Sequence, residues 1–200
     1  MGADLKDGYV AIRGWTEKSE LRWEDFFEKL EKYGVKTGDT LWEARQKCKD
    51  IIFIPPHYDT YVQYSEAIQK YYAQFTPQIE PFGLDECWLD VSHHPDPIQL
   101  AEQIRQDIRR IFHITVSIGV SFNKVFAKLG SDLKKPDAVT AIPAETYRHI
   151  VWGLPVSTLL GAGRATSENL RRIGISSIGQ LATADRKMIR ARLGKHGDKL

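Results

Sequence analysis

The chain has 200 residues, of which 42% are hydrophobic and 27% charged, so it can bury a core and is not a disordered sequence. Its longest apolar stretches, such as "DIIFIPP", fall far short of the roughly 20 residues that cross a bilayer. The start "MGADLKDG" lacks the plan of a signal peptide. We therefore expect a cytoplasmic protein without a membrane partner, and its two cysteines suit a reducing compartment.

The net charge of +2 is unevenly distributed. Residues 164–200 contain nine basic and three acidic residues, which leaves this end at +6 and the rest of the chain at −4. A basic segment of this kind is typical of a protein that binds a phosphate-rich partner. A solvated helical surface is the alternative, and charge alone does not separate the two.

The first 32 residues form no clear domain, and we leave 1–32 unassigned. "GYVAIRGW" suits a strand, and "ELRWEDFFEKLEKYG" suits a helix that ends at Gly34.

A helical domain is predicted over residues 33–76. Thr40 and Glu43 form a capping box that opens the helix "LWEARQKC". After a loop with two prolines, "DTYVQYSEAIQKYYAQF" carries apolar residues at helical intervals, with Asp59 as the expected cap and an end near Thr76.

An α/β domain of the α+β type is predicted over residues 77–155. "QIEPF" and "CWLDV" should pair as an antiparallel hairpin with Asp85 and Glu86 at its turn or at the start of its second strand. Asp96 and Pro97 begin a helix with one apolar stripe, and "ITVSIGVS" is a strand with one apolar face and one face of small residues. The helix "NKVFAKLGSDLKK" and the strand "AVTAI" follow. We expect a mainly antiparallel sheet with helices on one face and an open face of small residues.

A small helical domain is predicted over residues 156–200. "LLGAGRATSENLRRIGI" has the form of a helix-hairpin-helix, with glycines in the turn and a helix that starts near Arg164 or Ala165. Backbone N–H groups at that helix start favour a DNA phosphate without reading its sequence. The predicted DNA-binding residues are Gly161, Gly163, Arg164, Thr166, Arg171 and Arg172.

The adjacent carboxylates Asp85 and Glu86 suit a hard divalent cation, because Mg²⁺ takes oxygen ligands and usually binds one or two carboxylates together with substrate phosphates. We expect them on a rigid, buried hairpin, where Gly83 allows close backbone approach. The alternative is a pair of solvated turn residues.

Lysines gather on and beside the helix that follows Asn123. Lys135 precedes Pro136, which should end the helix and place that lysine as a phosphate clamp. We interpret Lys128 and Lys134 as part of a solvated helical face.

From about Tyr33 to Leu200 the chain resembles the Y-family DNA polymerases, the translesion group also called ImpB/MucB/SamB. "YGVKTGDTLWEARQKC" resembles the family's fingers segment and "PFGLDECWLDVS" its palm motif. "SIGVSFNKVFAKLGSDLKKPDAVTAI" resembles its Ser-Ile-Gly-x-Ser-x-Asn-Lys segment, and "VWGLPVSTLLGAGRATSENLRRIGI" resembles its thumb.

The resemblance implies a palm with a helical fingers segment and a partial helical thumb. It implies error-tolerant DNA synthesis past damage, in DNA repair and the SOS response. The reaction would join a deoxynucleoside triphosphate to a primer 3′-hydroxyl with two Mg²⁺ ions. Asp85 and Glu86 match two metal-binding carboxylates of the family, and Lys135 matches a lysine that contacts the triphosphate. The small-residue face of the palm and the thumb hairpin would hold primer-template DNA, and a sliding clamp is a further partner in the family.

Three parts of the family's pattern are missing from this sequence. The first is the strand with Asp-x-Asp, whose first Asp is the third metal ligand in the family. The other two are the Tyr-x-x-x-Arg element and the little-finger domain, which would follow "LGKHGDKL". If Asp4, Asp7 or Asp25 folds back to Asp85 and supplies the third carboxylate, the metal site is complete and catalysis is possible. Two hypotheses therefore stand: a polymerase or part of one, or a non-catalytic or truncated relative that binds only DNA or a polymerase partner. A palm-fold nucleotide cyclase is a third, but it does not explain the thumb.

Overall fold

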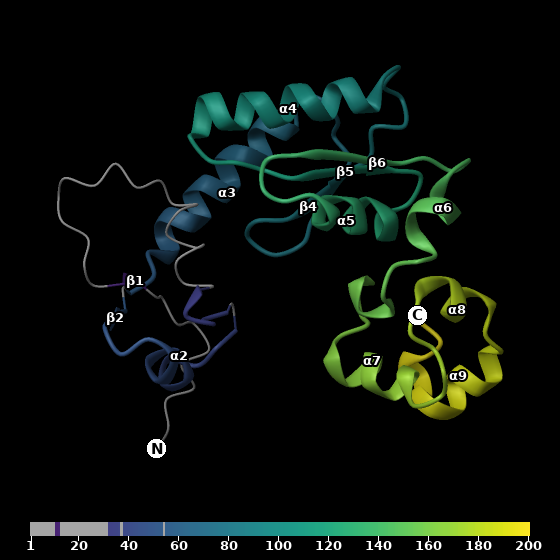
Figure 1. Ribbon diagram of the computed structural model, residues 1–200. Coiled ribbons are helices and arrows are strands. Elements are labelled where there is room, and N and C mark those ends of the chain that lie inside the picture. Colours follow the sequence, from purple (N-terminus) through teal and green to yellow (C-terminus); the bar gives the residue numbers. More distant parts are fainter. Residues whose placement is uncertain (1–10, 13–31, 37, 54) are drawn as a thin grey trace. The chain divides into compact units, whose positions relative to one another are not determined.

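The structure is a computed structural model that describes residues 11–12, 32–36, 38–53 and 55–200. The chain divides into two compact units, Met1–Val62 and Gln63–Leu200 (Figure 1). Within the described residues, no helix is long and apolar enough to cross a membrane.

In the first unit, helix α2 (Leu41–Lys47) begins with the predicted capping box. The Glu43 N–H donates to Thr40 Oγ1 at 3.2 Å, and the Thr40 N–H donates to Glu43 Oε2 at 2.8 Å. Strand β1 (Ala11–Ile12) pairs antiparallel with β2 (Ile51–Ile52). The small core of this unit consists of Val35, Ala44, Cys48 and Ile51, with Phe53 packed against it.

The strand predicted in "GYVAIRGW" is confirmed at Ala11–Ile12, and its other residues lie outside the described part of the chain. The helix predicted in "ELRWEDFFEKLEKYG" also lies outside it, apart from its last three residues. There Lys32 is helical and Gly34 has the left-handed φ of +74° that ends a helix.

Helix α3 (Tyr58–Tyr72) starts one residue before the predicted cap. The Tyr61 N–H donates to the His57 carbonyl at 3.1 Å, so His57 takes the cap position and Asp59 lies in the first turn. The predicted Asp59 cap is therefore wrong, although a carboxylate in the first turn still faces the positive end of the helix dipole.

The predicted hairpin is confirmed. Strand β3 (Ile79–Pro81) pairs antiparallel with β4 (Cys87–Leu89), and Asp85 and Glu86 lie in the connecting turn.

Helix α4 (Pro97–Phe112) begins as predicted, because Asp96 Oδ1 accepts from the N–H groups of Ile98 at 3.1 Å and Gln99 at 2.9 Å. Its apolar stripe packs with α3 and with residues of both neighbouring strand pairs. This core consists of Tyr71, Tyr72, Leu100, Ile104 and Ile108, and Ile79, Cys87, Leu89, Val116 and Ile118 pack against it.

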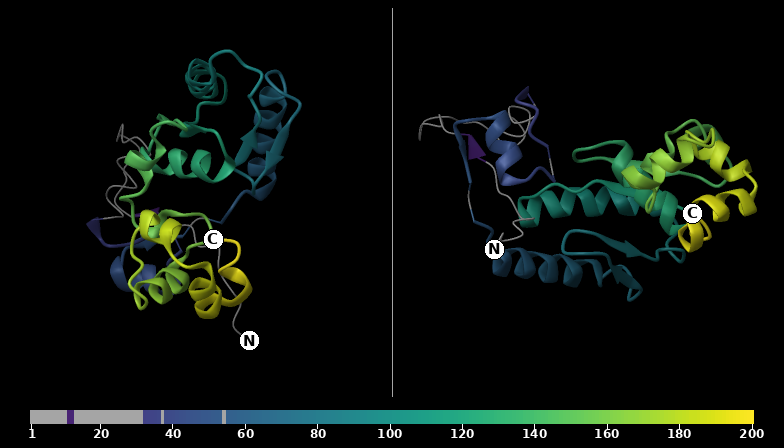
Figure 2. Two further views of the ribbon diagram at one scale, coloured as in Figure 1. Left: turned by 90° about the vertical axis from the view of Figure 1, so that its right-hand side faces the viewer. Right: turned by 90° about the horizontal axis from the view of Figure 1, so that it is seen from below.

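Strands β5 (Ile118–Ser121) and β6 (Val139–Ile142) are parallel and are joined by helix α5 (Lys124–Leu133). A Cβ atom at Gly119 would lie 1.8 Å from the Ala127 carbonyl oxygen, so α5 packs directly on the face of small residues. Figures 1 and 2 show α4 and α5 on opposite sides of this strand pair.

The α/β class is confirmed, but one detail is corrected: the small-residue face of β5 is not open, and helices lie on both sides of β5–β6. The physical reason is that glycine lets a helix axis approach a strand closely, so small residues mark a helix contact here. Within the described residues, the strands form three separate pairs, and no hydrogen bonds of a ladder join β4 to β5. The β1–β2 and β3–β4 pairs are antiparallel, and the β5–β6 pair is parallel.

The remaining elements are helical, as predicted, with one isolated bridge between Pro155 and Ser177. They are α6 (Tyr147–Val151), η1 (Val156–Thr158), α7 (Arg164–Arg171), α8 (Ile178–Thr183), α9 (Arg186–Leu193) and η2 (Gly194–His196). One core lies among the last of these helices, with Val156, Leu170 and Ile189 at its centre. A second core joins Ile178 of α8 to Leu129 of α5, so these helices pack on the β5–α5–β6 unit.

Candidate active site

The turn between β3 and β4 places the two carboxylates at one end of the hairpin. The Phe82 N–H donates to the Glu86 carbonyl at 2.8 Å, and Gly83 supplies the left-handed φ of +82° that the turn requires. Asp85 is exposed and Glu86 is partly buried. The hairpin is thus formed as predicted, but Asp85 is at its surface and is not buried.

Glu86 has one satisfied and one unsatisfied oxygen. Its Oε1 lies 3.0 Å from Lys128 Nζ. Its Oε2 is buried and has no hydrogen-bond partner within the described residues. A buried carboxylate oxygen without a partner is costly, so this atom is an acceptor available to a cation or a hydrogen-bond donor.

The interpretation of Lys128 as part of a solvated helical face is wrong. Only 17% of its side chain is exposed, and its ammonium group lies between Glu86 Oε1 at 3.0 Å and Asp132 Oδ2 at 2.9 Å. Burial alone would lower its pKa, but the hydrogen bonds to Asp132 and Glu86 outweigh burial and raise the pKa above its usual value. Lys134, in contrast, is exposed, as interpreted.

Lys135 lies just beyond the end of α5, which stops at Leu133 before Pro136 as predicted. Its side chain is 56% exposed, and its Nζ lies 2.7 Å from Asp132 Oδ1. Burial would raise the pKa of Asp132, but its contacts with Lys135 and Lys128 lower it below its usual value. The carboxylate of Asp132 therefore holds a lysine on each oxygen.

The hairpin contacts the start of α5 through polar and aromatic side chains. The Trp88 indole N–H donates to the Lys124 carbonyl at 3.0 Å, and Lys124 also forms an ion pair with Glu80. The rings of Phe82 and Trp88 lie 5.0 Å apart. These contacts bring the carboxylates of the turn to the lysines of α5, which are about 40 residues further along the chain.

A third metal ligand is not found in the described part of the chain, where no three His, Cys, Asp or Glu side chains gather in a way that could hold a metal ion. The three carboxylates that we considered for this role, Asp4, Asp7 and Asp25, lie outside the described residues.

The predicted glycine turn is present before α7, and the element that precedes it is the 3₁₀ helix η1. Gly161 has a φ of +90°, and its carbonyl accepts from His196 Nε2 at 2.9 Å. Gly163 is the cap residue, and within the described residues no side chain caps the helix. The first N–H groups of α7 are therefore not occupied by a capping side chain and can meet an anion.

The basic residues around this turn point to solvent. The Arg164 side chain is 93% exposed and lies 3.0 Å from Glu168, and Arg171 and Arg172 are exposed. Thr166 is partly buried in the first turn.

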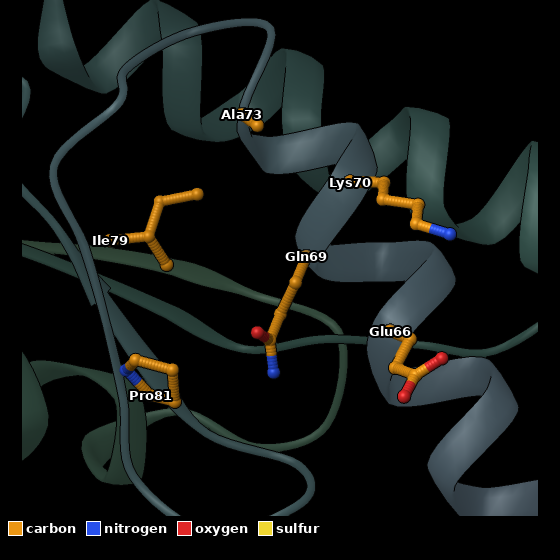
Figure 3. A pocket seen from close by; sticks show the side chains of 6 residues that line it. All are labelled: Glu66, Gln69, Lys70, Ala73, Ile79 and Pro81. Carbon is orange, nitrogen blue, oxygen red and sulfur yellow. The ribbon is translucent and has the colours of Figure 1, made fainter.

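A shallow groove of about 350 Å³ lies elsewhere, between α3 and β3. Figure 3 shows Gln69 and Ala73 of α3 facing Ile79 and Pro81 of β3, with Glu66 and Lys70 along the helix. None of the predicted site residues lines this groove.

The sequence matches the family model described as the impB/mucB/samB family over residues 4–132. The chain belongs to this family. The match begins at residue 4, so it also includes most of the segment that the motifs alone left unassigned.

Curated relatives of this impB/mucB/samB protein carry the name DNA polymerase IV. The protein of that name from Acetivibrio thermocellus is 44% identical over 200 residues, which cover 97% of this chain and 50% of the relative. DNA polymerase IV 1 of Bacillus subtilis is 34% identical over 170 residues, or 84% of this chain and 41% of the relative. The chain thus spans about half the length of the curated relatives that it matches.

Solved structures agree with the family assignment. A DinB family error-prone DNA polymerase from Sulfolobus solfataricus is similar at a TM-score of 0.78 and 26% identity, over 86% of this chain and 52% of that one. An insertion ternary complex of Dbh DNA polymerase is similar at a TM-score of 0.76 and 27% identity, over 84% of this chain and 50% of that one. The predicted resemblance to the Y-family polymerases is confirmed.

Proposed function

We propose that this chain forms the palm, the fingers segment and part of the thumb of a DNA-directed DNA polymerase of the translesion type. The reaction adds deoxynucleotides to a primer 3′-end opposite damaged template, in DNA repair and the SOS response. The observation that carries the proposal is the turn of the β3–β4 hairpin, where Glu86, next to Asp85 in the sequence, lies 3.0 Å from Lys128 of α5. Family membership and the names of the relatives support it.

The donor set of this turn fits Mg²⁺. Both side chains offer carboxylate oxygens, which Mg²⁺ prefers, and Glu86 Oε2 is buried and lacks a partner within the described residues. Asp85 and Glu86 would hold the metal, with two ions expected in a complete site. When bound, Mg²⁺ supplies positive charge to the phosphate oxygens and the attacking 3′-oxygen.

Lys135 is the residue that we assign to the triphosphate. It is exposed, it lies past the end of α5, and it is linked to Glu86 through Asp132 and Lys128. An ammonium group on a flexible stem neutralises phosphate charge and follows the nucleotide as it binds.

The start of α7 is the surface that we assign to DNA. Its open N–H groups favour a backbone phosphate, and the surrounding arginines add charge that attracts DNA of any sequence. The residues involved are Gly161, Gly163, Arg164, Thr166, Arg171 and Arg172. The proposal also includes a sliding clamp as a partner of the protein and a location in the cytoplasm.

A second candidate function is binding of DNA or of a polymerase partner without catalysis. The observation that favours it is that no three His, Cys, Asp or Glu side chains within the described residues gather in a way that could hold a metal ion. The two functions differ in chemistry but share the DNA surface on α7.

Primer extension separates them. The protein is mixed with Mg²⁺, four deoxynucleotides and a primer-template that is either undamaged or carries one abasic site. A polymerase extends both primers, and the Asp85→Ala/Glu86→Ala double variant extends neither. If folded wild-type protein binds the primer-template in a gel-shift assay but extends no primer, the catalytic proposal is wrong and the binding function stands.

A further inference from the structure

Lys128 joins the two ends of the candidate active site. Glu86 Oε1, Lys128 Nζ and Asp132 Oδ2 are linked at 3.0 and 2.9 Å, and Asp132 Oδ1 continues the chain to Lys135 Nζ at 2.7 Å. Negative and positive groups alternate along this line. One end is the carboxylate assigned to the metal, and the other is the lysine assigned to the triphosphate.

The ammonium group of Lys128 acts as the counter-ion of the Glu86 carboxylate. Its side chain is only 17% exposed and Glu86 is 35% exposed, so water screens this pair less than it screens a surface pair. A divalent cation on Glu86 would face this ammonium group at short range. Because the two are like charges, a cation on Glu86 would weaken the contact between Lys128 and this carboxylate.

Asp132 is already placed to receive Lys128. It lies four residues further along α5, in the i,i+4 position that favours an ion pair on one helix face. With Lys128 wholly on Asp132, that carboxylate would hold two lysines and no longer share Lys128 with Glu86. Its hold on Lys135, whose side chain is already 56% exposed, would weaken, and a triphosphate could take this lysine.

We propose that Lys128 is an internal counter-ion that the metal displaces from Glu86, and that Asp132 passes this displacement on to Lys135. Lys128 therefore weakens metal binding when no nucleotide is present and couples the metal site to the triphosphate lysine. It acts as a positioning residue. This inference rests on the proposed metal site at Asp85 and Glu86.

The test measures Mn²⁺ binding, because Mn²⁺ accepts the same carboxylate ligands as Mg²⁺ and its free concentration is read by electron paramagnetic resonance without any turnover. The full chain is titrated at constant pH and ionic strength. The Lys128→Met and Lys128→Gln variants should each bind Mn²⁺ with a Kd about tenfold lower than wild type. The glutamine variant removes the charge but keeps an N–H donor at this position, so it tests the proposal even if Lys128→Met does not fold.

Two controls separate this effect from charge and from structure. Lys134→Met removes the same charge from the end of the same helix, where the side chain is exposed, and should change the Kd by less than twofold. Lys128→Arg keeps the charge and should stay within about twofold of wild type. Circular dichroism of each variant confirms that the helices are retained.

The outcomes are distinct. If wild-type protein binds no Mn²⁺, or if Asp85→Asn/Glu86→Gln binds it equally well, the proposed metal site is wrong and this inference falls with it. If the site binds Mn²⁺ but folded Lys128→Gln has an unchanged or weaker affinity, the inference alone is overturned. An equal gain in Lys134→Met also overturns it, because the effect would then be general charge.

Discussion

The strands β5 and β6 and the β3–β4 hairpin contact α5 in different ways. In the first, two strands pair over four residues and α5 packs on them through Gly119, Leu129 and Ile142. The hairpin pairs over three residues and meets α5 mainly through the side chains of Glu80, Glu86 and Trp88.

This difference divides the candidate site into a half that packs closely and a half that polar side chains connect to it. The lysines lie on the close-packed unit, whereas the carboxylates lie on an exposed turn that polar contacts hold. A substitution at the α5 interface should therefore cost much stability, and one at the hairpin contacts should cost little. Three changes test this contrast, from the largest expected effect to the smallest, and a fourth tests an ion pair on α4.

Gly119→Ala should have the largest effect. Its new methyl group would lie 1.8 Å from the Ala127 carbonyl oxygen, so α5 must shift as a body. We expect a loss of about 3 kcal/mol in the free energy of unfolding, measured by urea denaturation followed by circular dichroism. Gly153→Ala is the control, because its added Cβ meets nothing within 4 Å. Equal denaturation midpoints for the two variants would contradict the close packing of α5.

Leu129→Ala should come next. Leu129 is 2% exposed and belongs to the core shared with Ile142 and Ile178, so its truncation should cost about 2 kcal/mol, the lower end of the range for such truncations. Leu84→Ala, in the exposed hairpin turn, should change stability by less than about 0.5 kcal/mol. The same urea titration compares them. A loss in the turn variant as large as that in the core would remove the proposed contrast.

Trp88→Phe tests the hairpin contact. It removes the indole N–H that donates to the Lys124 carbonyl and should cost about 1 kcal/mol. Trp42→Phe, at a side chain that is 70% exposed in the other unit, is the matched control and should be neutral. A Trp88 variant as stable as the control would mean that this contact does not hold the hairpin.

Glu102→Gln should have the smallest effect and one that depends on pH. Hydrogen bonds from Arg105 and Gln106 lower the pKa of Glu102 from 4.5 to about 2, and Arg105 also contacts Asp137 at 2.7 Å beside the loop of Lys135. Because the folded-state pKa is depressed, the stabilisation is present above about pH 4.5 and is lost as the pH falls toward 2.

The wild type should therefore be more stable than Glu102→Gln at pH 7, and the difference should shrink between about pH 4.5 and 2. Urea midpoints at a series of pH values measure this. A difference that grows as the pH falls would mean that the ionised carboxylate does not stabilise the fold.

Several features were predictable because nearby residues determine them. The capping box of Thr40 and Glu43, the Asp96 cap, the β3–β4 hairpin and the Gly-x-Gly turn before Arg164 each depend on residues a few positions apart. Such local hydrogen bonds and backbone preferences depend on the residue types alone, so the sequence is enough to predict them. The same holds for the motifs that identify the family.

Tertiary structure decided the rest. Gly119 pointed to an open face in the sequence, but α5 covers it, because a small residue serves a close helix contact as well as a free surface. In the sequence, nothing distinguishes Lys128 from a solvated lysine. In the structure, the hairpin places Glu86, 42 residues away in the sequence, 3.0 Å from its ammonium group. The charge of a side chain can be read from the sequence, but its partner depends on which distant elements pack against each other, and burial then decides how strongly the two interact.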